Sequence, residues 1–360
     1  MPRILHASLR PSASVLLVLG GSAAGGFGYR YWTSAKDASS AAESSTLHPL
    51  RFAHYAIADR TPVSSTSSLF TLHARDADAT AQQDLQDIWA RSVWSVEAKQ
   101  PQLQIARAYT PLPPTSSSSE PADGDGGGDT AASQFRFLIR RERGGEVSNY
   151  LHRLPPDATV ELRGPHVAFE IPDDVSEVLF LAGGTGIAPA LQVARALQMR
   201  GREASMRILW ANRKREDCVG GRSDTAAAQE MGSGWGAWLG WSRKEQEEDS
   251  GRTGGESGVI VREIDNLKHR AGSGQRLAVD YFVDEEKTFI QPSHVIRHLQ
   301  EASKPGEKST GSRLILISGP DGFLDYWAGR KIWAEQGEVQ GPLRGALSRI
   351  DLKGWRVWKL

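Results

Sequence analysis

The stretch "LFLAGGTGIAPA", residues 179–190, places three glycines directly after an apolar run. Residues 177–182 are rich in Val, Leu and Phe, which predicts a strand buried on both faces. From Ile187 onward apolar residues recur at helical spacing, and Pro189 lies in the first turn, where proline is tolerated. The stretch therefore predicts a strand, a tight glycine turn and a helix.

The glycine turn is typical of a phosphate site. Gly183, Gly184 and Gly186 lack a Cβ, so a ligand can approach the backbone, and the N–H groups and dipole at a helix start attract phosphate. The spacing G-G-x-G differs from the common dinucleotide fingerprint G-x-G-x-x-G. A turn that only lets the helix pack on the sheet would need similar glycines. Taken alone, the stretch leaves both interpretations open.

Length and composition narrow the class of protein. A chain of 360 residues can form two ordinary domains. Acidic and basic residues balance at 43 each, so no bulk charge favours nucleic acid as a partner. Cys218 is the single cysteine, which excludes an intrachain disulfide and a thiolate metal cluster. We expect no metal site, and any redox chemistry requires an organic cofactor.

The first 36 residues have the composition of a mitochondrial leader. They contain no acidic residue, several basic ones and many Ser and Ala. Residues 11–29 carry no charge, and a helix of that length reaches roughly 28 Å, which is close to the hydrocarbon thickness of a bilayer. The sequence predicts a single membrane span through residues 11–29. A cleaved leader without a lasting anchor is the alternative.

The rest of the chain divides by pattern. Residues 37–47 form a polar linker. Residues 48–172 contain short apolar runs between turn residues, which predict an antiparallel β barrel, interrupted by a low-complexity insertion at 113–134. Residues 173–360 alternate strand and helix patterns, which predicts a doubly wound parallel sheet. A second insertion covers residues 220–257. Either its tryptophans form a patch that binds a partner, or the insertion is a simple expansion of a surface loop.

Individual elements follow from the same patterns. The predicted strands are 52–58, 68–74, 101–109, 135–142, 206–211 and 313–319. The predicted helices after the glycine turn are 292–301 and 322–335.

Three further motifs accompany the glycine turn. They are R-x-Y-T at 107–110, the segment Gly145 to Ser148 after a predicted strand, and S-G-P-D at 318–321. In this order and spacing the four motifs resemble the ferredoxin-NADP reductase superfamily, over about residues 48–360. The resemblance implies FAD on the β barrel and a nicotinamide dinucleotide on the following domain.

The resemblance also implies roles for single residues. Arg107 would pair with the FAD pyrophosphate, because a guanidinium meets phosphate oxygens bidentately. Tyr109 would lie against the isoalloxazine, and Thr110 would hydrogen-bond near flavin N5, the atom that accepts hydride. The remaining cofactor-binding residues would be Gly145, Val147 and Ser148 for FAD, and Gly183, Gly184, Thr185, Gly186, Gly319, Pro320 and Asp321 for the nicotinamide dinucleotide.

Ser318 departs from the pattern of the family. Much of the family has cysteine at this position, with its sulfur near the nicotinamide ring. A hydroxyl still hydrogen-bonds but is less polarisable, so we expect the geometry to survive and hydride transfer to be slower. Thr110 and Ser318 are the predicted catalytic residues, and Cys218 is an incidental thiol rather than a replacement.

A closer resemblance concerns the whole chain. The leader, the serine-rich tether and the ending "GWRVWKL" resemble fungal mitochondrial flavoproteins that support haem attachment to cytochrome c. This implies an enzyme that passes electrons from NADH or NADPH through FAD to ferric haem or a haem protein. It also implies an anchor in the mitochondrial inner membrane, with the flavin domain in the intermembrane space.

Alternatives remain at this stage. The protein could be a reductase of the cytochrome b5 reductase type that serves another haem protein, or a redox-silent assembly scaffold. The cations Arg213, Lys214 and Arg215 follow a predicted strand, where they would either read a ribose 2′-phosphate or form a solvated turn. The choice between NADH and NADPH is therefore open.

Overall fold

The computed structural model describes residues 47–360, apart from 75–80, 115–133, 202, 226–256, 271–274, 304–310 and 336. The predicted leader, the predicted span at 11–29 and nearly all of the linker lie outside the described residues, as do most of the two predicted insertions. Within the described part of the chain, no helix combines the length and apolarity that crossing a membrane requires.

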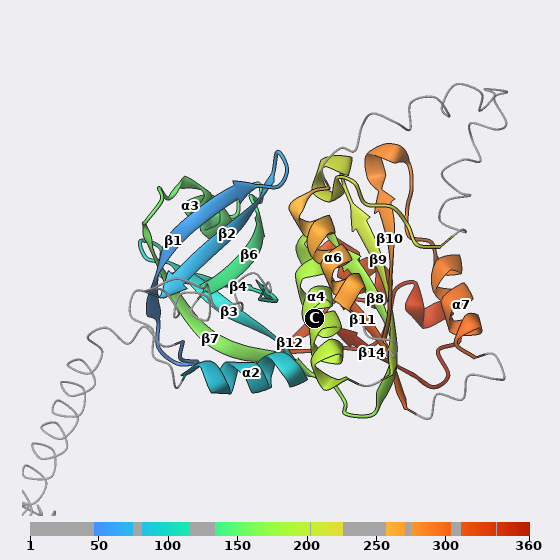
Figure 1. Ribbon diagram of the computed structural model, residues 1–360. Coiled ribbons are helices and arrows are strands. Elements are labelled where there is room, and N and C mark those ends of the chain that lie inside the picture. The colour runs from blue at the N-terminus through green and yellow to red at the C-terminus, as the bar shows by residue number, and fades with distance from the viewer. Residues whose placement is uncertain are drawn as a thin grey trace, which may run out of the picture. The chain divides into compact units, whose positions relative to one another are not determined.

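The first domain is a seven-stranded antiparallel sheet that curls around an apolar core (Figure 1). The strand order is β4-β3-β7-β1-β2-β6-β5. This confirms the predicted antiparallel fold. The strands are β1 (Ala53–Pro62), β2 (Ser67–Ala74), β3 (Ser92–Gln100), β4 (Ile105–Tyr109), β5 (Pro111–Leu112), β6 (Gln134–Arg140) and β7 (Thr159–Glu170).

Two details of the first domain differ from the predictions. Residues 101–104 form a turn, so the predicted strand 101–109 is wrong in its first half and β4 begins at Ile105. Helix α2 (Ala81–Arg91) and strand β3 were not predicted from the sequence. A second helix, α3 (Glu146–Arg153), follows β6 and buries Val147 and Leu151 in the core.

The second domain is a five-stranded parallel sheet in the order β10-β9-β8-β11-β14. Helices α4 and α6 contribute to the apolar core on one face of this sheet, and α7 and α8 contribute to the core on the other face. The predicted doubly wound fold is confirmed. The elements are β8 (Val175–Gly183), β9 (Ala204–Asn212), β10 (Gln275–Val283), β11 (Ser312–Ser318), β14 (Trp355–Lys359), α4 (Ile187–Arg200), α6 (Val259–Arg270), α7 (Pro292–Glu301) and α8 (Asp321–Ala328).

Strand β8 shows why a continuous apolar run suits the centre of this sheet. Phe180 and Ala182 belong to the core cluster on one face, and Leu179 and Leu181 to the cluster on the other. All four side chains are fully buried. Since successive side chains point to opposite faces, a central strand covered on both sides needs apolar residues at every position.

The predicted helix 322–335 is wrong beyond its first half. Helix α8 ends at Ala328, because Gly329 has φ +77° and leaves the helical conformation. The chain then forms a two-stranded hairpin, β12 (Ile332–Ala334) and β13 (Gly337–Val339). Its apolar residues Ile332 and Trp333 are exposed, so they continue the helical spacing without forming part of a helix.

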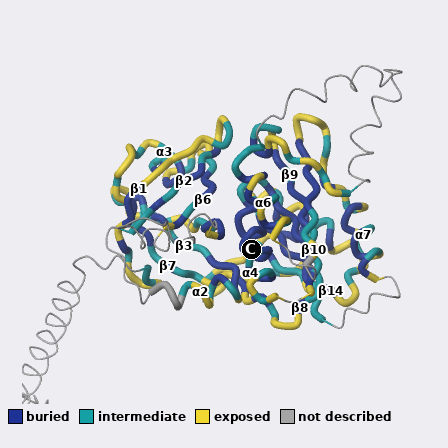
Figure 2. Tube along the Cα trace, in the orientation of Figure 1, coloured by how far each residue is buried: buried dark blue, intermediate teal, exposed yellow. Residues whose placement is uncertain are grey.

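Helix α4 connects the two domains. Residues 45–360 form one unit, and α4 lies on the side of the parallel sheet that faces the barrel (Figure 1). It is buried along most of its length (Figure 2), as expected for a helix that is apolar around its circumference.

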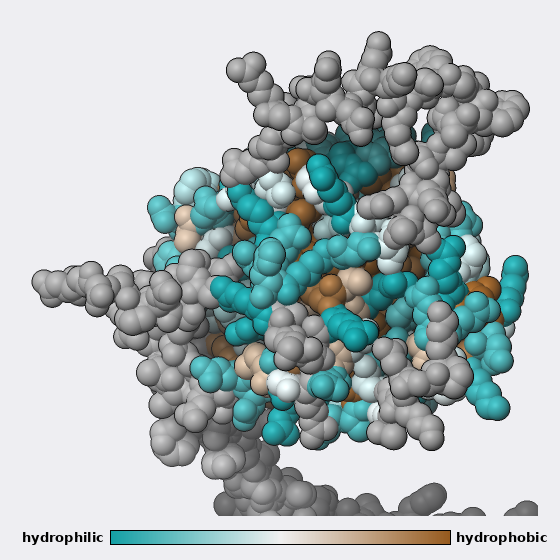
Figure 3. Space-filling model, turned by 45° about the vertical axis from the view of Figure 1, so that its right-hand side comes forward, coloured by the Kyte–Doolittle hydropathy of each residue, from teal (hydrophilic) through white to brown (hydrophobic). Residues whose placement is uncertain are grey.

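Charged pairs also cross between the domains, including Arg140 with Asp217 at 2.8 Å. On the face in Figure 3, hydrophilic residues surround small apolar areas.

We expect one buried histidine to make folding stability sensitive to acid. His298 on α7 lies with Nε2 3.4 Å from Glu177 Oε1, and burial lowers its pKa from 6.5 to about 4, with Arg207 acting in the same direction. Between these two pH values the unfolded chain binds more protons, so the free energy of unfolding falls as the pH decreases. The expected loss is about 2–3 kcal/mol.

The measurement is urea unfolding at pH 7 and at pH 5, on the parent protein and on His298→Leu. The variant should show a smaller difference between the two pH values, because leucine binds no proton in either state. Equal differences in the two proteins would contradict this assignment.

Candidate functional site

The glycine turn joins β8 to α4 as the sequence predicts. Strand β8 ends at Gly183, a short 3-10 turn, η2 (Gly184–Gly186), follows, and α4 begins at Ile187. Gly184 has φ +54°, a left-handed conformation that favours glycine. No side chain hydrogen-bonds to the N–H groups at the start of α4. A helix start of this kind favours the binding of an anion.

The individual glycines serve different purposes. A Cβ on Gly186 would lie 2.3 Å from the Ser318 carbonyl oxygen, and one on Gly183 would meet the Phe323 ring at 3.0 Å. Gly186 is therefore small because the turn packs against the end of β11, and Gly183 because it packs against Phe323 of α8. A Cβ on Gly184 would meet nothing closer than the Arg140 guanidinium at 3.8 Å. The packing interpretation therefore applies to Gly183 and Gly186, while contact with a phosphate stays a prediction for Gly184.

The late motif S-G-P-D lies beside the glycine turn. Ser318 ends β11, Gly319 follows, and α8 begins at Asp321 after Pro320. Because β11 pairs directly with β8, a Cβ on Gly319 would lie 3.1 Å from the Gly183 Cα. The two predicted nucleotide motifs, far apart in sequence, therefore meet at the carboxyl edge of the parallel sheet, which is where ligands bind in such sheets.

Thr110 and Ser318, the two predicted catalytic residues, line the same cavity of about 550 Å³. Thr110 comes from the barrel and Ser318 from the carboxyl end of β11. A cavity of this volume is in the range of small-molecule and cofactor sites. Its walls are Val93, Trp94, Ser95, Ala108, Thr110, His166, Val167, Ala168, Pro189, Ser318, Lys331, Glu338, Val339, Gln340, Trp358, Lys359 and Leu360.

Several cavity residues were missed by the sequence analysis. Gln340 and Lys331 come from the ends of the hairpin, and Lys359 and Trp358 from β14. Gln340 holds the hairpin to β14 with two hydrogen bonds, because its Oε1 accepts from the Lys359 N–H at 2.8 Å and its Nε2 donates to the Lys359 carbonyl at 2.9 Å. The ending "GWRVWKL" contributes to the resemblance to haem-attachment flavoproteins, but the sequence gives no sign that this segment forms a cavity wall.

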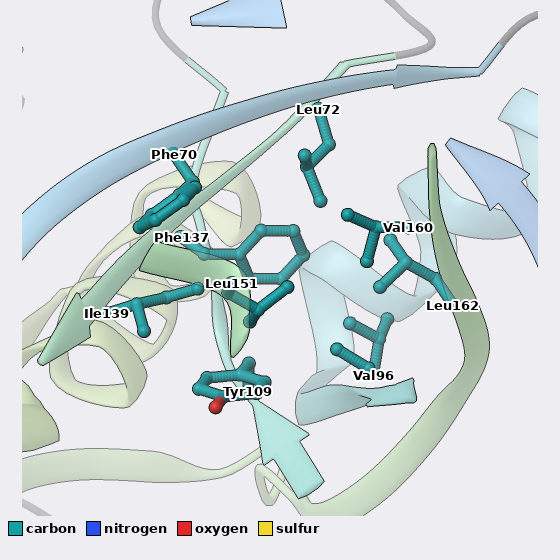
Figure 4. Close-up of a pocket in the computed structure, with 10 residues that line it drawn as sticks. Phe70, Leu72, Val96, Tyr109, Phe137, Ile139, Leu151, Val160 and Leu162 are labelled. Atoms are coloured by element: carbon teal, nitrogen blue, oxygen red, sulfur yellow. The ribbon is translucent and has the colours of Figure 1, made fainter. Parts of the chain in front are cut away.

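Tyr109 lies elsewhere than Thr110. Its ring faces an apolar pocket in the barrel interior, formed among others by Phe137, Leu151 and Val96 (Figure 4). Burial raises the pKa of the Tyr109 phenol above its usual range, and Glu142 adds to this while Arg107 opposes it. Tyr109 is therefore a neutral group at physiological pH, and its side chain is not among the walls of the larger cavity.

Arg107 precedes Tyr109 by two residues on β4. Its side chain is exposed, and its Nη1 donates to the neighbouring Ala106 carbonyl at 2.9 Å. The structure gives Arg107 no ion pair among the described residues. The guanidinium is thus available for an anionic ligand.

The predicted FAD-binding residues at the start of α3 make contacts within the barrel that the sequence does not indicate. The Ser148 hydroxyl accepts from the Glu142 N–H at 3.2 Å and donates to the Gly145 carbonyl at 3.3 Å, so it stabilises the turn before the helix. The Val147 side chain lies in the barrel core. What this segment offers to a phosphate is therefore its backbone, since no side chain caps α3 at Gly145.

The three cations after β9 are partly neutralised. Arg215 donates from Nε to the Glu286 carboxylate at 2.6 Å, and this hydrogen bond lowers the pKa of Glu286. Lys214 lies 3.3 Å from Glu216, while Arg213 is exposed. Acidic residues of η4 (Asp284–Glu286) thus stand beside the cations that a 2′-phosphate would have to use. Cys218 is buried, and burial raises the pKa of its thiol to about 11.

An antiparallel FAD-type barrel followed by a doubly wound sheet, with the motifs meeting between them, defines a two-domain flavin oxidoreductase. Residues 56–171 match the oxidoreductase FAD-binding domain and residues 180–272 the oxidoreductase NAD-binding domain. The chain belongs to the ferredoxin-NADP reductase superfamily, and FAD and a nicotinamide dinucleotide are the cofactors of its two domains.

Particular relatives show how the similarity is distributed. The chain is 39% identical over 94 residues to the cytochrome c mitochondrial import factor CYC2 of Saccharomyces cerevisiae, covering 24% of this chain and 25% of that protein. It is 39% identical over 87 residues to ferredoxin--NADP reductase B of Sorangium cellulosum, covering 24% and 36%. It is 24% identical over 216 residues to NADH-cytochrome b5 reductase 2 of Lodderomyces elongisporus, covering 58% and 57%. The chain thus spans between a quarter and somewhat over half of these relatives' lengths.

The residues present fit these cofactors. The cavity between the domains is large enough for a planar ring system. The exposed Arg107 guanidinium and the uncapped start of α3 leave donors for a pyrophosphate on the barrel. The uncapped start of α4 offers the same at the edge of the parallel sheet.

Proposed function

We propose that this protein is an NAD(P)H-dependent flavin reductase that passes electrons to ferric haem or a haem protein and supports haem attachment to cytochrome c in mitochondria. The observation that carries the reductase part is the cavity shared by Thr110 and Ser318. The haem acceptor is supported by two relatives whose names refer to cytochromes, which are haem proteins.

Each residue would perform a limited task. When bound, FAD supplies the chemistry that accepts a hydride from a nicotinamide and releases electrons singly. Arg107 and the backbone at the start of α3 bind its pyrophosphate, and the Thr110 hydroxyl donates a hydrogen bond toward its reactive ring. On the opposite wall, the Ser318 hydroxyl orients the nicotinamide by a hydrogen bond. Trp358 and the hairpin exclude water from the cavity.

The test of this function is a comparison of electron acceptors with the purified protein. We expect NADH- or NADPH-dependent reduction of ferric cytochrome c, and also of ferricyanide, a small acceptor that needs no docking surface. Reduction of ferric cytochrome b5 in preference to cytochrome c would replace the proposed partner by that of a cytochrome b5 reductase. No nucleotide oxidation with any acceptor would contradict the reductase and favour a redox-silent scaffold.

We expect NADH to be preferred to NADPH. The carboxylates of η4 stand beside the strand end where the adenosine ribose would lie, and Glu286 already occupies Arg215. A 2′-phosphate would be repelled by these like charges and would lack a free guanidinium at Arg215. The ratio of kcat/KM for NADH to that for NADPH should exceed about 10, which corresponds to about 1.4 kcal/mol.

The double variant Glu285→Gln and Glu286→Gln checks the cause of this preference. It removes both carboxylates that contact Arg215 and should lower the ratio by raising kcat/KM for NADPH. A ratio that stays unchanged, or a parent protein that prefers NADPH, would show that η4 does not select the nucleotide.

The proposed location is the mitochondrial inner membrane, with residues 11–29 as the span and the flavin domain in the intermembrane space. It is supported by the composition of residues 1–36 and by the relative named as a cytochrome c mitochondrial import factor. Protease added to mitochondria with a ruptured outer and an intact inner membrane should digest the domain, and carbonate should not extract it. A protected, extractable domain would place the enzyme in the matrix.

A further inference from the structure

Gln192 on α4 is fully buried, and its side-chain amide contacts the backbone of the other domain. Its Oε1 accepts from the Trp94 N–H at 2.9 Å. Its Nε2 donates to the Trp94 carbonyl at 3.1 Å and to the Pro111 carbonyl at 2.9 Å. Both amide donors are thus used, and one side chain of the parallel-sheet domain joins β3 and β5 of the barrel.

The atoms held by Gln192 are next to the walls of the cavity. Trp94 itself lines the cavity, and Pro111 directly follows Thr110, which lines it too. On the helix side, Pro189 lines the cavity one turn before Gln192, and the glycine turn ends at Gly186, three residues before Pro189. A few residues of rigid helix therefore separate the glycine turn from the barrel segment that carries Thr110.

We infer that Gln192 is a positioning residue, which fixes the distance between the flavin wall of the cavity at Thr110 and the nicotinamide wall at Ser318. This inference rests on the proposed reductase function. A neutral amide suits the task, because a buried ion in its place would need a compensating charge. Backbone partners suit it as well, since strands move less than side chains do. Gln192 is not among the residues that line the cavity, so it acts through the two walls.

Polar side chains nearer the end of α4 do not have this position. Arg200, at the far end of α4, donates to the Ala90, Ile171 and Pro172 carbonyls at 2.8–2.9 Å, away from the cavity. Gln198 on the same helix donates to the Leu267 carbonyl at 2.6 Å, so its hydrogen bond stays within the parallel-sheet domain. Gln198 is therefore the matched control for Gln192.

The test is anaerobic single-turnover reduction of the bound flavin by saturating NADH. In Gln192→Met, which keeps the volume of the side chain but loses its hydrogen bonds, the limiting rate constant should fall by at least about tenfold, because a 1 Å misplacement costs on the order of 100-fold. FAD content and the NADH concentration at half-saturation should stay near those of the parent. The bound flavin of Gln198→Met should be reduced at the parental rate.

Gln192→Glu provides a second measurement, which also serves if the methionine variant does not fold. An ionised carboxylate would face the Trp94 and Pro111 carbonyls without a donor, while the protonated acid regains one donor. The rate of this variant relative to the parent should rise as the pH falls from 8 to 6. A merely structural role would not give this dependence on pH.

The outcomes are distinguishable. Parental reduction rates in Gln192→Met, or a pH-independent ratio in Gln192→Glu, would overturn the positioning role while leaving the proposed reductase intact. Equal slowing in the Gln192 and Gln198 variants would overturn it as well, because the effect would then come from the helix in general. A parent protein that no nicotinamide nucleotide reduces would overturn the proposed function, and this inference with it.

Discussion

Arg107→Ala is expected to lose most of its bound FAD while the protein remains folded. The Arg107 side chain is exposed and its described hydrogen bond goes to the adjacent Ala106 carbonyl, so its removal costs little stability. A pyrophosphate would lose a charge-assisted bidentate partner, which weakens binding by about 2–4 kcal/mol, on the order of 100-fold in Kd. Flavin absorbance per protein after gel filtration, with Tm recorded in parallel, measures both effects.

Arg60→Ala is the matched control on the same barrel. Arg60 donates to the His152 and Leu154 carbonyls at the carboxyl end of α3, opposite to the end where the pyrophosphate is expected. This variant should keep its FAD. If Arg107→Ala retained as much flavin as the parent, the assignment of R-x-Y-T to the pyrophosphate would be wrong.

Gly184→Val is expected to remain yellow yet no longer react with NADH. Gly184 has φ +54°, which a β-branched residue adopts only with strain of about 1–2 kcal/mol. Its Cβ position is otherwise open, so the side chain would occupy the space through which the nucleotide reaches the backbone. The rate of flavin reduction by NADH should fall by at least on the order of 100-fold, as misplacement of a substrate costs in other sites. Titration of flavin reduction against NADH measures it.

Gly186→Ala separates packing from binding within the same motif. A Cβ on Gly186 would lie 2.3 Å from the Ser318 carbonyl oxygen, so the start of α4 must shift away from β11. This variant should lose about 1–3 kcal/mol of unfolding free energy, as other overpacked cores do. Loss of FAD in Gly184→Val, or unchanged stability in Gly186→Ala, would mean that the two glycines have been given the wrong roles.

The parts of the fold that local sequence determines were predictable. Strand β8 is apolar at every position because both of its faces are covered, and the turn after it is rich in glycine because β11 and a helix start meet there. Thr110 and Ser318 line one cavity, but their predicted catalytic roles came from the order of motifs, not from a physical pattern, and they stay predictions. The fold class followed from the alternation of strand and helix patterns.

Other features depend on contacts between distant segments. Helical spacing continues past Gly329, but the positive φ of that glycine ends α8, and the spacing of apolar residues does not indicate this. Ser148 is predicted to bind FAD, but the sequence does not indicate that its hydroxyl also stabilises the turn at Gly145. The residues around Gln192 and Gln340 do not indicate the hydrogen-bond partners of these side chains, because tertiary structure alone brings the partners close.

An anaerobic absorbance experiment on the purified protein tests most directly whether electrons pass from NADH through a bound flavin to cytochrome c. We expect a bound flavin whose absorbance bleaches when NADH is added and returns when ferric cytochrome c follows, with cytochrome c reduced in proportion. A protein that binds no flavin, or whose flavin stays oxidised in the presence of both NADH and NADPH, would contradict the proposed function.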